Sequence, residues 1–299
     1  MTHVATVMAP FEALSIGDPE ITAFALAVSR LGGKPLDHKW LAKGQVFDLF
    51  FEEENPGSDA LLEAAGLSGL QIDCIIQKVE TRAKKLFVAD MDSTIIAEES
   101  IDEIALELGL SEKVAPITEA AMLGKLEFSD ALRKRVALLK GLSKKRLRRV
   151  LDERIHFNPG AKTLIATLKA EAIQTALVSG GFTFFTNPLA KTLGFDFVRA
   201  NQLEFENGTL NGSVTTPIVD GETKKAFLIE TSKINSLQRN QTLALGDGAN
   251  DIPMFGAAGL SLSYHGKPAA EKAADGNLRH FDLTGVLFAL GIPESRFCS

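Results

Sequence analysis

The sequence predicts an α/β protein, in which a parallel, Rossmann-like sheet carries an inserted block of helices and follows a small α+β domain. The chain has 299 residues, roughly twice the usual domain of about 100–200 residues. Strand and helix patterns over residues 1–80 follow the order βαββαβ, typical of a ferredoxin-like unit. Over residues 84–299, apolar strands alternate with helices, as in a parallel sheet, except at 98–155, where only helical patterns occur.

Each element of the leading segment has its own signal. Residues 2–8 are apolar and β-branched, which predicts a strand. A helix is expected over 18–31, with Asp18 as its N-cap and Pro19 at its first position. The segment holds no cluster of catalytic residue types, so we expect it to serve regulation or assembly. Its other predicted elements are strands at 34–41 and 46–51 around a Lys43-Gly44 turn, a helix at 58–65 ended by Gly66, and a strand at 70–79.

The second part begins with a short apolar strand at 85–89, as expected where helices cover both faces of a sheet. After the helical insert, Asn158 is expected to cap a helix over 156–170 that starts at Pro159. Asn207-Gly208 suits the tight turn of a hairpin. The remaining predicted elements are strands at 174–178 and 242–246 and helices near 182–193, 223–232 and 251–258.

Composition excludes several classes of protein. Hydrophobic residues make up 45% and charged residues 23%, which is ordinary for a globular chain. The net charge of −6 argues against a mainly nucleic-acid-binding protein. The two cysteines cannot form a disulfide framework, and neither a membrane-length apolar run nor a signal peptide occurs. A reducing cytoplasm is therefore the expected location. Residues 1–84 hold 7 basic and 12 acidic residues, whereas the remainder is nearly neutral, which supports a boundary near residue 84.

Polar residues gather at three predicted strand ends. Ligands of an open α/β sheet bind at the carboxyl ends of its strands. One such end could be a plain turn or a helix cap, but three on one sheet edge predict a site. The three ends carry Asp90 and Asp92, then Ser179, Gly180 and Gly181, and finally Asp247, Asn250 and Asp251.

These residue types suit phosphate chemistry. Three carboxylates at one edge would repel each other unless a cation lay among them, and hard oxygen ligands suit Mg²⁺. A turn of the chain after Asp90 would let Asp92 act from the side of the site. The Ser179 hydroxyl and the Gly180 and Gly181 amides would supply donors to phosphate oxygens.

The segments DMDST (90–94), VSGG (178–181), Lys224 and GDGAND (246–251) together resemble the four motifs of the haloacid dehalogenase-like phosphohydrolases. Within that family the chain resembles the phosphoserine phosphatases of serine biosynthesis over residues 85–290. The leading segment resembles the amino-acid-binding ACT-like domain found in front of many such enzymes. The resemblance implies Mg²⁺-dependent hydrolysis of O-phospho-L-serine through an aspartyl-phosphate, and it leaves a homodimer open.

The resemblance also implies a role for each matching position. Asp90 would be the nucleophile and Asp92 the general acid and base. The implied metal ligands are Asp90, the Asp92 carbonyl and Asp247, with Asp251 supporting them. The residues implied to hold substrate are Ser179, Gly180, Lys224 and Asn250 for the phosphoryl group, Glu99 for the ammonium, Arg135 for the carboxylate, and Phe128 and Met122 as an apolar cover.

Several alternatives remain open on the sequence alone. Lys225 could be the true match in place of Lys224, and Glu99 and Arg135 each lie among charged neighbours that could be a solvated face. The basic run over 133–149 lacks the aromatic residues of a nucleic-acid site and is expected to be a solvated face of the insert. Another phosphomonoesterase or a phosphotransferase would share the core motifs. In a rival of another class, the leading domain senses an amino acid and the core is residual.

Overall fold

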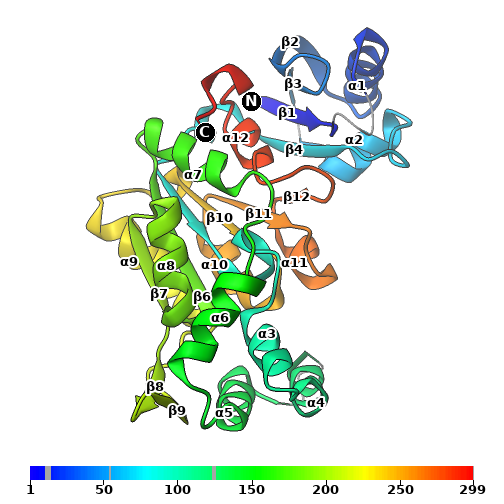
Figure 1. The fold of residues 1–299 in the computed structure, drawn as a ribbon. Coiled ribbons are helices and arrows are strands. Elements are labelled where there is room, and N and C mark those ends of the chain that lie inside the picture. The colour runs from blue at the N-terminus through cyan, green and yellow to red at the C-terminus, as the bar shows by residue number, and fades with distance from the viewer. Residues whose placement is uncertain (11–14, 54, 123–125, 299) are drawn as a thin grey trace.

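The computed structural model describes residues 1–10, 15–53, 55–122 and 126–298, without the side chains of 121 and 122. Two sheets organise it (Figure 1). A four-stranded antiparallel sheet lies near the N-terminus, and a six-stranded parallel sheet forms the middle of the molecule. A block of helices over residues 100–154 lies at the end opposite the N-terminal sheet (Figure 1). The predicted fold class is confirmed.

The N-terminal unit has the predicted βαββαβ order, and its strands pair as β2-β3-β1-β4. The first helix buries Phe24 and Val28 against the sheet. Its N-cap is Gly17, not Asp18 as predicted, and the Gly17 N–H donates to Glu20 Oε2 at 2.8 Å. The Glu20 carboxylate thus binds the backbone of the N-cap residue, and the Asp18 side chain does not cap the helix. The elements are β1 (Thr2–Met8), α1 (Asp18–Arg30), β2 (Lys34–Ala42), β3 (Val46–Glu52), α2 (Ser58–Ala64) and β4 (Asp73–Lys78).

The parallel sheet has the order β12-β11-β10-β5-β6-β7, so the first strand of this part lies near its centre. Neighbours on either side of β5 are β6 and β10, and the chain order reverses there. The carboxyl ends of these three strands carry the three polar segments found in the sequence. The strands are β5 (Leu86–Ala89), β6 (Gln174–Phe182), β7 (Phe197–Asn201), β10 (Thr242–Gly246), β11 (Leu260–Tyr264) and β12 (Gly276–Leu278).

Alternate side chains of the strands point into two different cores. Phe87 and Ala89 belong to the core shared with α7, α8 and α12, whereas Leu86 and Val88 belong to the core shared with α9, α10 and α11. Helices therefore cover both faces, which explains the continuous apolar run of β5. The helices are α7 (Ala161–Ala170), α8 (Thr183–Leu193), α9 (Gly221–Ile234), α10 (Ile252–Ala257), α11 (Pro268–Ala273) and α12 (Gly285–Ala289).

In the described ranges the inserted block, hereafter the cap, contains four helices, and a hairpin from the second half of the chain packs against it. The hairpin turns at Asn207-Gly208, where both φ angles are positive (48° and 79°), as the sequence predicts. Its Leu210 exchanges backbone hydrogen bonds of 2.8 Å with Gly141 and Leu142 at the end of the third cap helix. The elements are α3 (Ser100–Glu107), α4 (Ser111–Met122), α5 (Phe128–Leu138), α6 (Lys144–Arg154), β8 (Leu203–Glu206) and β9 (Thr209–Val214).

Two chain segments connect the cap to the sheet, and they pair with each other. Ile96 bridges to Phe157, and the amide group of Asn158 donates to the carbonyls of Thr94 and Ile96 at 2.8 and 3.0 Å. The prediction that Asn158 caps the following helix is therefore wrong. The helix begins at Ala161 behind Gly160, which adopts a φ of 80°.

Polar anchors fasten the N-terminal unit to the rest of the protein. The Arg82 guanidinium donates to both Asp48 oxygens at 2.6 and 2.8 Å and to the carbonyls of Phe288 and Ala289 at 2.9 and 3.0 Å. The Asp73 carboxylate accepts three backbone N–H groups from residues 279–281 at 2.8–3.0 Å. No helix in the described ranges has both the length and the apolar character needed to cross a bilayer.

Candidate active site

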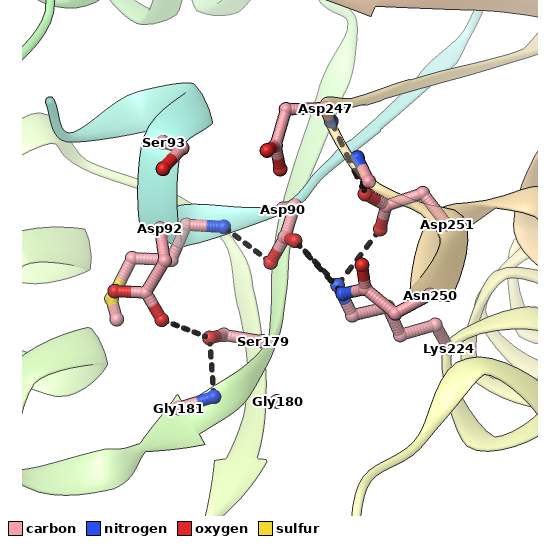
Figure 2. A network of polar contacts seen from close by, with 12 residues as sticks. Asp90, Asp92, Ser93, Ser179, Gly180, Gly181, Lys224, Asp247, Asn250 and Asp251 are labelled. Carbon is pink, nitrogen blue, oxygen red and sulfur yellow. Dashed lines mark hydrogen bonds and ion pairs between the residues drawn. The ribbon is translucent and has the colours of Figure 1, made fainter. Parts of the chain in front are cut away.

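Asp90 lies at the carboxyl end of β5 and points into the centre of the site (Figure 2). Only 3% of the residue is exposed. One carboxylate oxygen, Oδ1, accepts the Met91 N–H at 2.7 Å, and the other, Oδ2, lies 2.6 Å from the Lys224 ammonium. The Asn250 amide donates to Oδ2 at 3.4 Å. Both oxygens are therefore held in fixed directions.

The chain turns sharply after Asp90, and this turn decides where Asp92 points. Asp92 is extended and Ser93 is left-handed, with a φ of 52°. The Asp92 carboxylate accepts the Ser100 N–H at 2.9 Å and lies 3.5 Å from the Ser179 hydroxyl. Burial raises the pKa of Asp92 well above its usual value, and the charges of Glu99 and Asp90 raise it further. The carboxyl group is thus able to hold a proton close to Asp90.

The Ser179-Gly180-Gly181 segment completes the second strand end. The Ser179 hydroxyl oxygen accepts the Gly181 N–H at 2.8 Å. A Cβ on Gly181 would lie 2.7 Å from Asp92 Oδ2, and one on Gly180 would lie 2.9 Å from the Phe128 ring of the cap. A larger residue at either position would push the Asp92 carboxyl group or the Phe128 ring away, because both approach the backbone closely.

Lys224 is completely buried on α9 and bridges two carboxylates. Its ammonium lies 2.6 Å from Asp90 and 2.8 Å from Asp251. Burial would lower the pKa of Lys224, but the two carboxylates outweigh it and the pKa is raised. Lys225, by contrast, is half-exposed and pairs with Glu222. The geometry favours Lys224 over the alternative at 225.

Asp247 and Asp251 bring two further carboxylates to Asp90. Among the described residues these three offer oxygens within 4.8 Å of one another (Figure 2). Asp251 already accepts Lys224 and the backbone N–H groups of Asp247 and Gly248, so it supports the cluster. Burial and the charge of Asp90 raise the pKa of Asp247 to about 6. A divalent cation fits this donor set, because it would relieve the mutual repulsion of hard oxygen ligands.

The cap contributes the residues expected to recognise an amino acid. Glu99 is the N-cap residue of α3, and its Oε1 accepts the Ser93 hydroxyl at 3.0 Å. Arg135 is half-buried on α5, whereas its neighbours Arg133 and Lys134 are exposed. Burial lowers the pKa of Arg135, and the carboxylates of Asp102, Glu99 and Asp92 act against that shift. The guanidinium therefore lies in the field of these three acidic residues.

Two site residues escaped the sequence reasoning. Lys267 contacts Asp247 at 3.0 Å, and Ser93 contacts Glu99. Lys267 follows β11, a fourth strand end, so the same rule about carboxyl ends could have found it. The sequence-predicted residues Asp90, Asp92, Ser179, Gly180, Lys224, Asp247 and Asn250 lie together at the sheet edge, Glu99 lies beside them, and Arg135 faces them from the cap. The side chain of Met122 lies outside the described residues.

Comparison with known proteins adds independent findings. A family model described as haloacid dehalogenase-like hydrolase matches residues 87–256. A phosphoserine phosphatase from Albidiferax ferrireducens is 43% identical over 208 residues, which are 68% of this chain and 88% of that protein. Two other curated relatives are longer, and this chain spans 59% and 52% of them.

Solved structures agree. A haloacid dehalogenase-family hydrolase from Salmonella enterica serovar Typhi has a TM-score of 0.84 at 29% identity, covering 97% of this chain and 98% of that one. A phosphoserine phosphatase solved as a phospho-aspartyl intermediate analogue has a TM-score of 0.65 at 40% identity, covering 69% and 98%. Family and carboxylate cluster together imply a divalent metal. The matched residues are more than half of the chain and include all three strand ends that build the site, so this protein belongs to the haloacid dehalogenase-like hydrolases.

Proposed function

We propose that this protein is a Mg²⁺-dependent phosphatase that hydrolyses O-phospho-L-serine to L-serine and phosphate. The observation that carries the proposal is the buried Asp90 carboxylate, held by Lys224 and flanked by the proton-holding Asp92. Relatives named phosphoserine phosphatase support the assignment of the substrate. A phosphoserine phosphatase solved as a phospho-aspartyl intermediate analogue supports a reaction through an aspartyl-phosphate.

The first chemical step is attack of an Asp90 oxygen on phosphorus. A P–O bond forms to Asp90 as the bond to the serine oxygen breaks, and Asp92 gives its proton to that leaving oxygen. Asp92 is then an anion and takes a proton from water, whose oxygen attacks the aspartyl-phosphate. Phosphate leaves, Asp90 is regenerated, and Asp92 is protonated again.

Phosphoryl oxygens would be held by the donors around Asp90. The Ser179 hydroxyl and the Gly180 N–H would donate from the second strand end, the Lys224 ammonium from α9 and the Asn250 amide from the third strand end. Lys224 neutralises charge on the transferring group and, through Asp251, is fixed in place before substrate arrives. Pre-oriented donors of this kind cost no reorganisation during the reaction.

The Asp90 and Asp247 carboxylates and the Asp92 carbonyl would hold Mg²⁺. The bound ion supplies positive charge to the phosphoryl group and screens the carboxylates from one another. Asp251 keeps Asp247 and Gly248 in place through their backbone N–H groups.

The amino-acid part of the substrate would bind under the cap. Glu99 pairs with its ammonium and Arg135 with its carboxylate, where the planar guanidinium can make two parallel hydrogen bonds. Phe128, which contacts Gly180, would exclude water from the reacting centre. We assign catalysis to residues 84–299, with the cap at 98–155, and regulation or assembly, through an ACT-like fold, to residues 1–80. A cytoplasmic location and pairing of two copies fit this assignment.

A phosphate-release assay tests the proposal. With Mg²⁺ present, phosphate should be released from O-phosphoserine far faster than from sugar phosphates or nucleotides, and chelation should abolish the release. Asp90→Asn should remove turnover while the circular dichroism spectrum stays unchanged. Normal turnover by folded Asp90→Asn protein would overturn the assignment of the nucleophile. Transfer of phosphate to added alcohols in preference to water would instead identify a phosphotransferase.

A further inference from the structure

Lys267 lies in the loop between β11 and α11, at a fourth strand end beside the site. Its ammonium is 3.0 Å from Asp247 Oδ2 and 3.5 Å from Glu99 Oε1. Its backbone N–H donates to the Asp247 carbonyl at 2.8 Å. Lys267 therefore touches Asp247 twice and also reaches Glu99, the residue that precedes α3.

We propose that Lys267 is a positioning residue, which orients Asp247 toward the metal and Glu99 toward the substrate ammonium. This inference rests on the proposed function, because it assigns Lys267 to the same site. It adds a link between the half of the site that binds phosphate and the half that binds the amino acid.

The contacts leave one oxygen of each carboxylate for a ligand. In the described part of the chain, polar side chains reach Oδ2 of Asp247 and Oε1 of Glu99. The second oxygens, Asp247 Oδ1 and Glu99 Oε2, have no such contact there. When one oxygen of a carboxylate is held by a hydrogen-bond partner, the other oxygen points in a defined direction. Partners around a metal ligand orient that ligand in this way.

Lys267 is suited to this task because it is charged and anchored. Partial burial disfavours the ammonium, but Asp247 and Glu99 outweigh that effect and raise the pKa of Lys267. The backbone hydrogen bond to Asp247 and the following Pro268 restrict the main chain from which the side chain extends. The other lysine at the site, Lys224, is already paired with Asp90 and Asp251 and cannot replace it.

The alternative is that Lys267 only balances charge, as many half-exposed ion pairs do. The two roles differ in the sign of their effect on Mg²⁺. A bare positive charge repels a cation, so its removal would tighten Mg²⁺ binding. Loss of an orienting partner would weaken Mg²⁺ binding, typically about tenfold or more.

The test compares Lys267→Met, Lys267→Arg and the matched control Lys272→Met, which replaces an exposed lysine of α11. Mg²⁺ binding is measured by titration calorimetry on substrate-free protein, so this readout does not depend on turnover. The ratio of kcat/KM for O-phosphoserine to that for p-nitrophenyl phosphate is then measured at saturating Mg²⁺. The second ester has no ammonium for Glu99 to bind.

We expect Lys267→Met to weaken Mg²⁺ binding about tenfold and to lower the kcat/KM ratio by a similar factor, mainly through KM for phosphoserine. Lys267→Arg should recover most of both losses, because a guanidinium can donate to two carboxylates. Lys272→Met should match the wild type. Tighter or unchanged Mg²⁺ binding, or an unchanged ratio, in folded Lys267→Met protein would overturn the inference. Failure of the wild-type protein to hydrolyse phosphoserine would instead reject the proposed function.

Discussion

The Asp92 carboxyl group shows how a single environment sets a chemical role. Burial and the nearby charges of Glu99 and Asp90 raise its pKa, whereas the Ser100 N–H stabilises its anion. In the proposed reaction the group would give a proton to the leaving oxygen and later accept one from water. Its neighbour two residues earlier, Asp90, instead lies 2.6 Å from the Lys224 ammonium.

Replacing Asp92 by Asn should slow both half-reactions, because amide nitrogen neither donates a proton to an alkoxide nor accepts one from water. We expect kcat to fall on the order of 100-fold or more, while the melting temperature stays close to that of the wild type. Steady-state phosphate release and single-turnover formation of serine measure the two steps. An unchanged rate of serine formation would show that another group is the acid.

The raised pKa of Asp247 leads us to expect that metal binding depends on pH. Its pKa is raised from 3.8 to about 6, so the folded, metal-free protein holds this proton at pH values where the unfolded chain has lost it. The associated stability is present below about pH 4 and is lost as the pH rises toward 6. The affinity for metal has the opposite pH dependence and rises with pH, because a ligand carboxyl group must first lose its proton.

Mg²⁺ affinity of substrate-free protein should therefore fall as the pH drops through about 6, with protons released on binding near that pH. Calorimetry in two buffers of different ionisation enthalpy counts those protons. Asp130→Asn, which changes an exposed carboxylate of the cap, is the control and should leave the profile unchanged. Equal affinity at pH 5 and pH 7 would contradict the prediction.

Helix α5 carries two residues of the cap that are expected to face the site. Its first residue, Phe128, lies against Gly180, and Arg135 lies two turns later on the half-buried face. Residues seven apart share a helix face, so both can point toward the site while Arg133 and Lys134 face solvent. The basic run of the sequence thus divides into one inward guanidinium and an exposed face, where Arg146 and Arg149 pair with Glu107.

Arg135→Ala should raise KM for O-phosphoserine by at least tenfold. This factor corresponds to the loss of about 1.4 kcal/mol of binding free energy, which a charge-assisted hydrogen bond supplies. KM for p-nitrophenyl phosphate, which lacks a carboxylate, should change little. Arg135→Lys should recover only a small part, since an ammonium cannot make the paired contact. Arg133→Ala is the matched control. Equal losses with both esters would show that Arg135 binds phosphate or supports the cap.

The whole molecule shows which features a sequence reveals. Strand ends, the βαββαβ order and the Asn207-Gly208 turn are local patterns, so they were predictable. The side chain of Asn158 binds carbonyls more than 60 residues earlier in the chain, and Lys267 reaches Glu99 from still farther away. The strand-end rule could place Lys267 at the site, but no local signal records which partners it contacts. The N-cap residue of α1 lies one position before the predicted one, because the Gly17 N–H donates to Glu20. Errors thus fall where long-range contacts or competing local partners decide.

The contacts between the N-terminal unit and the rest of the protein indicate how a protein without that unit should behave. Met8, Val46 and Ile75 of that unit belong to the same apolar core as β10 and α12, and Arg82 and Asp73 add polar anchors. Removal of residues 1–83 would expose this apolar surface near β12. Yet the site lies at the far edge of β5, β6 and β10, and a solved phosphoserine phosphatase is covered to 98% by only 69% of this chain. A core without the leading unit is therefore able to exist.

We expect a protein of residues 84–299 to keep kcat within about threefold of the full chain, because no site residue is lost. Its melting temperature should fall by several degrees, since exposing apolar area costs about 25 cal/mol per Å². Solution mass measured beside kcat and KM shows whether the leading unit also pairs two copies. Leu278→Ala in the full chain, which weakens the packing near β12 alone, separates lost packing from lost assembly. A soluble, monodisperse but inactive protein of residues 84–299 would mean that the N-terminal unit shapes the site itself.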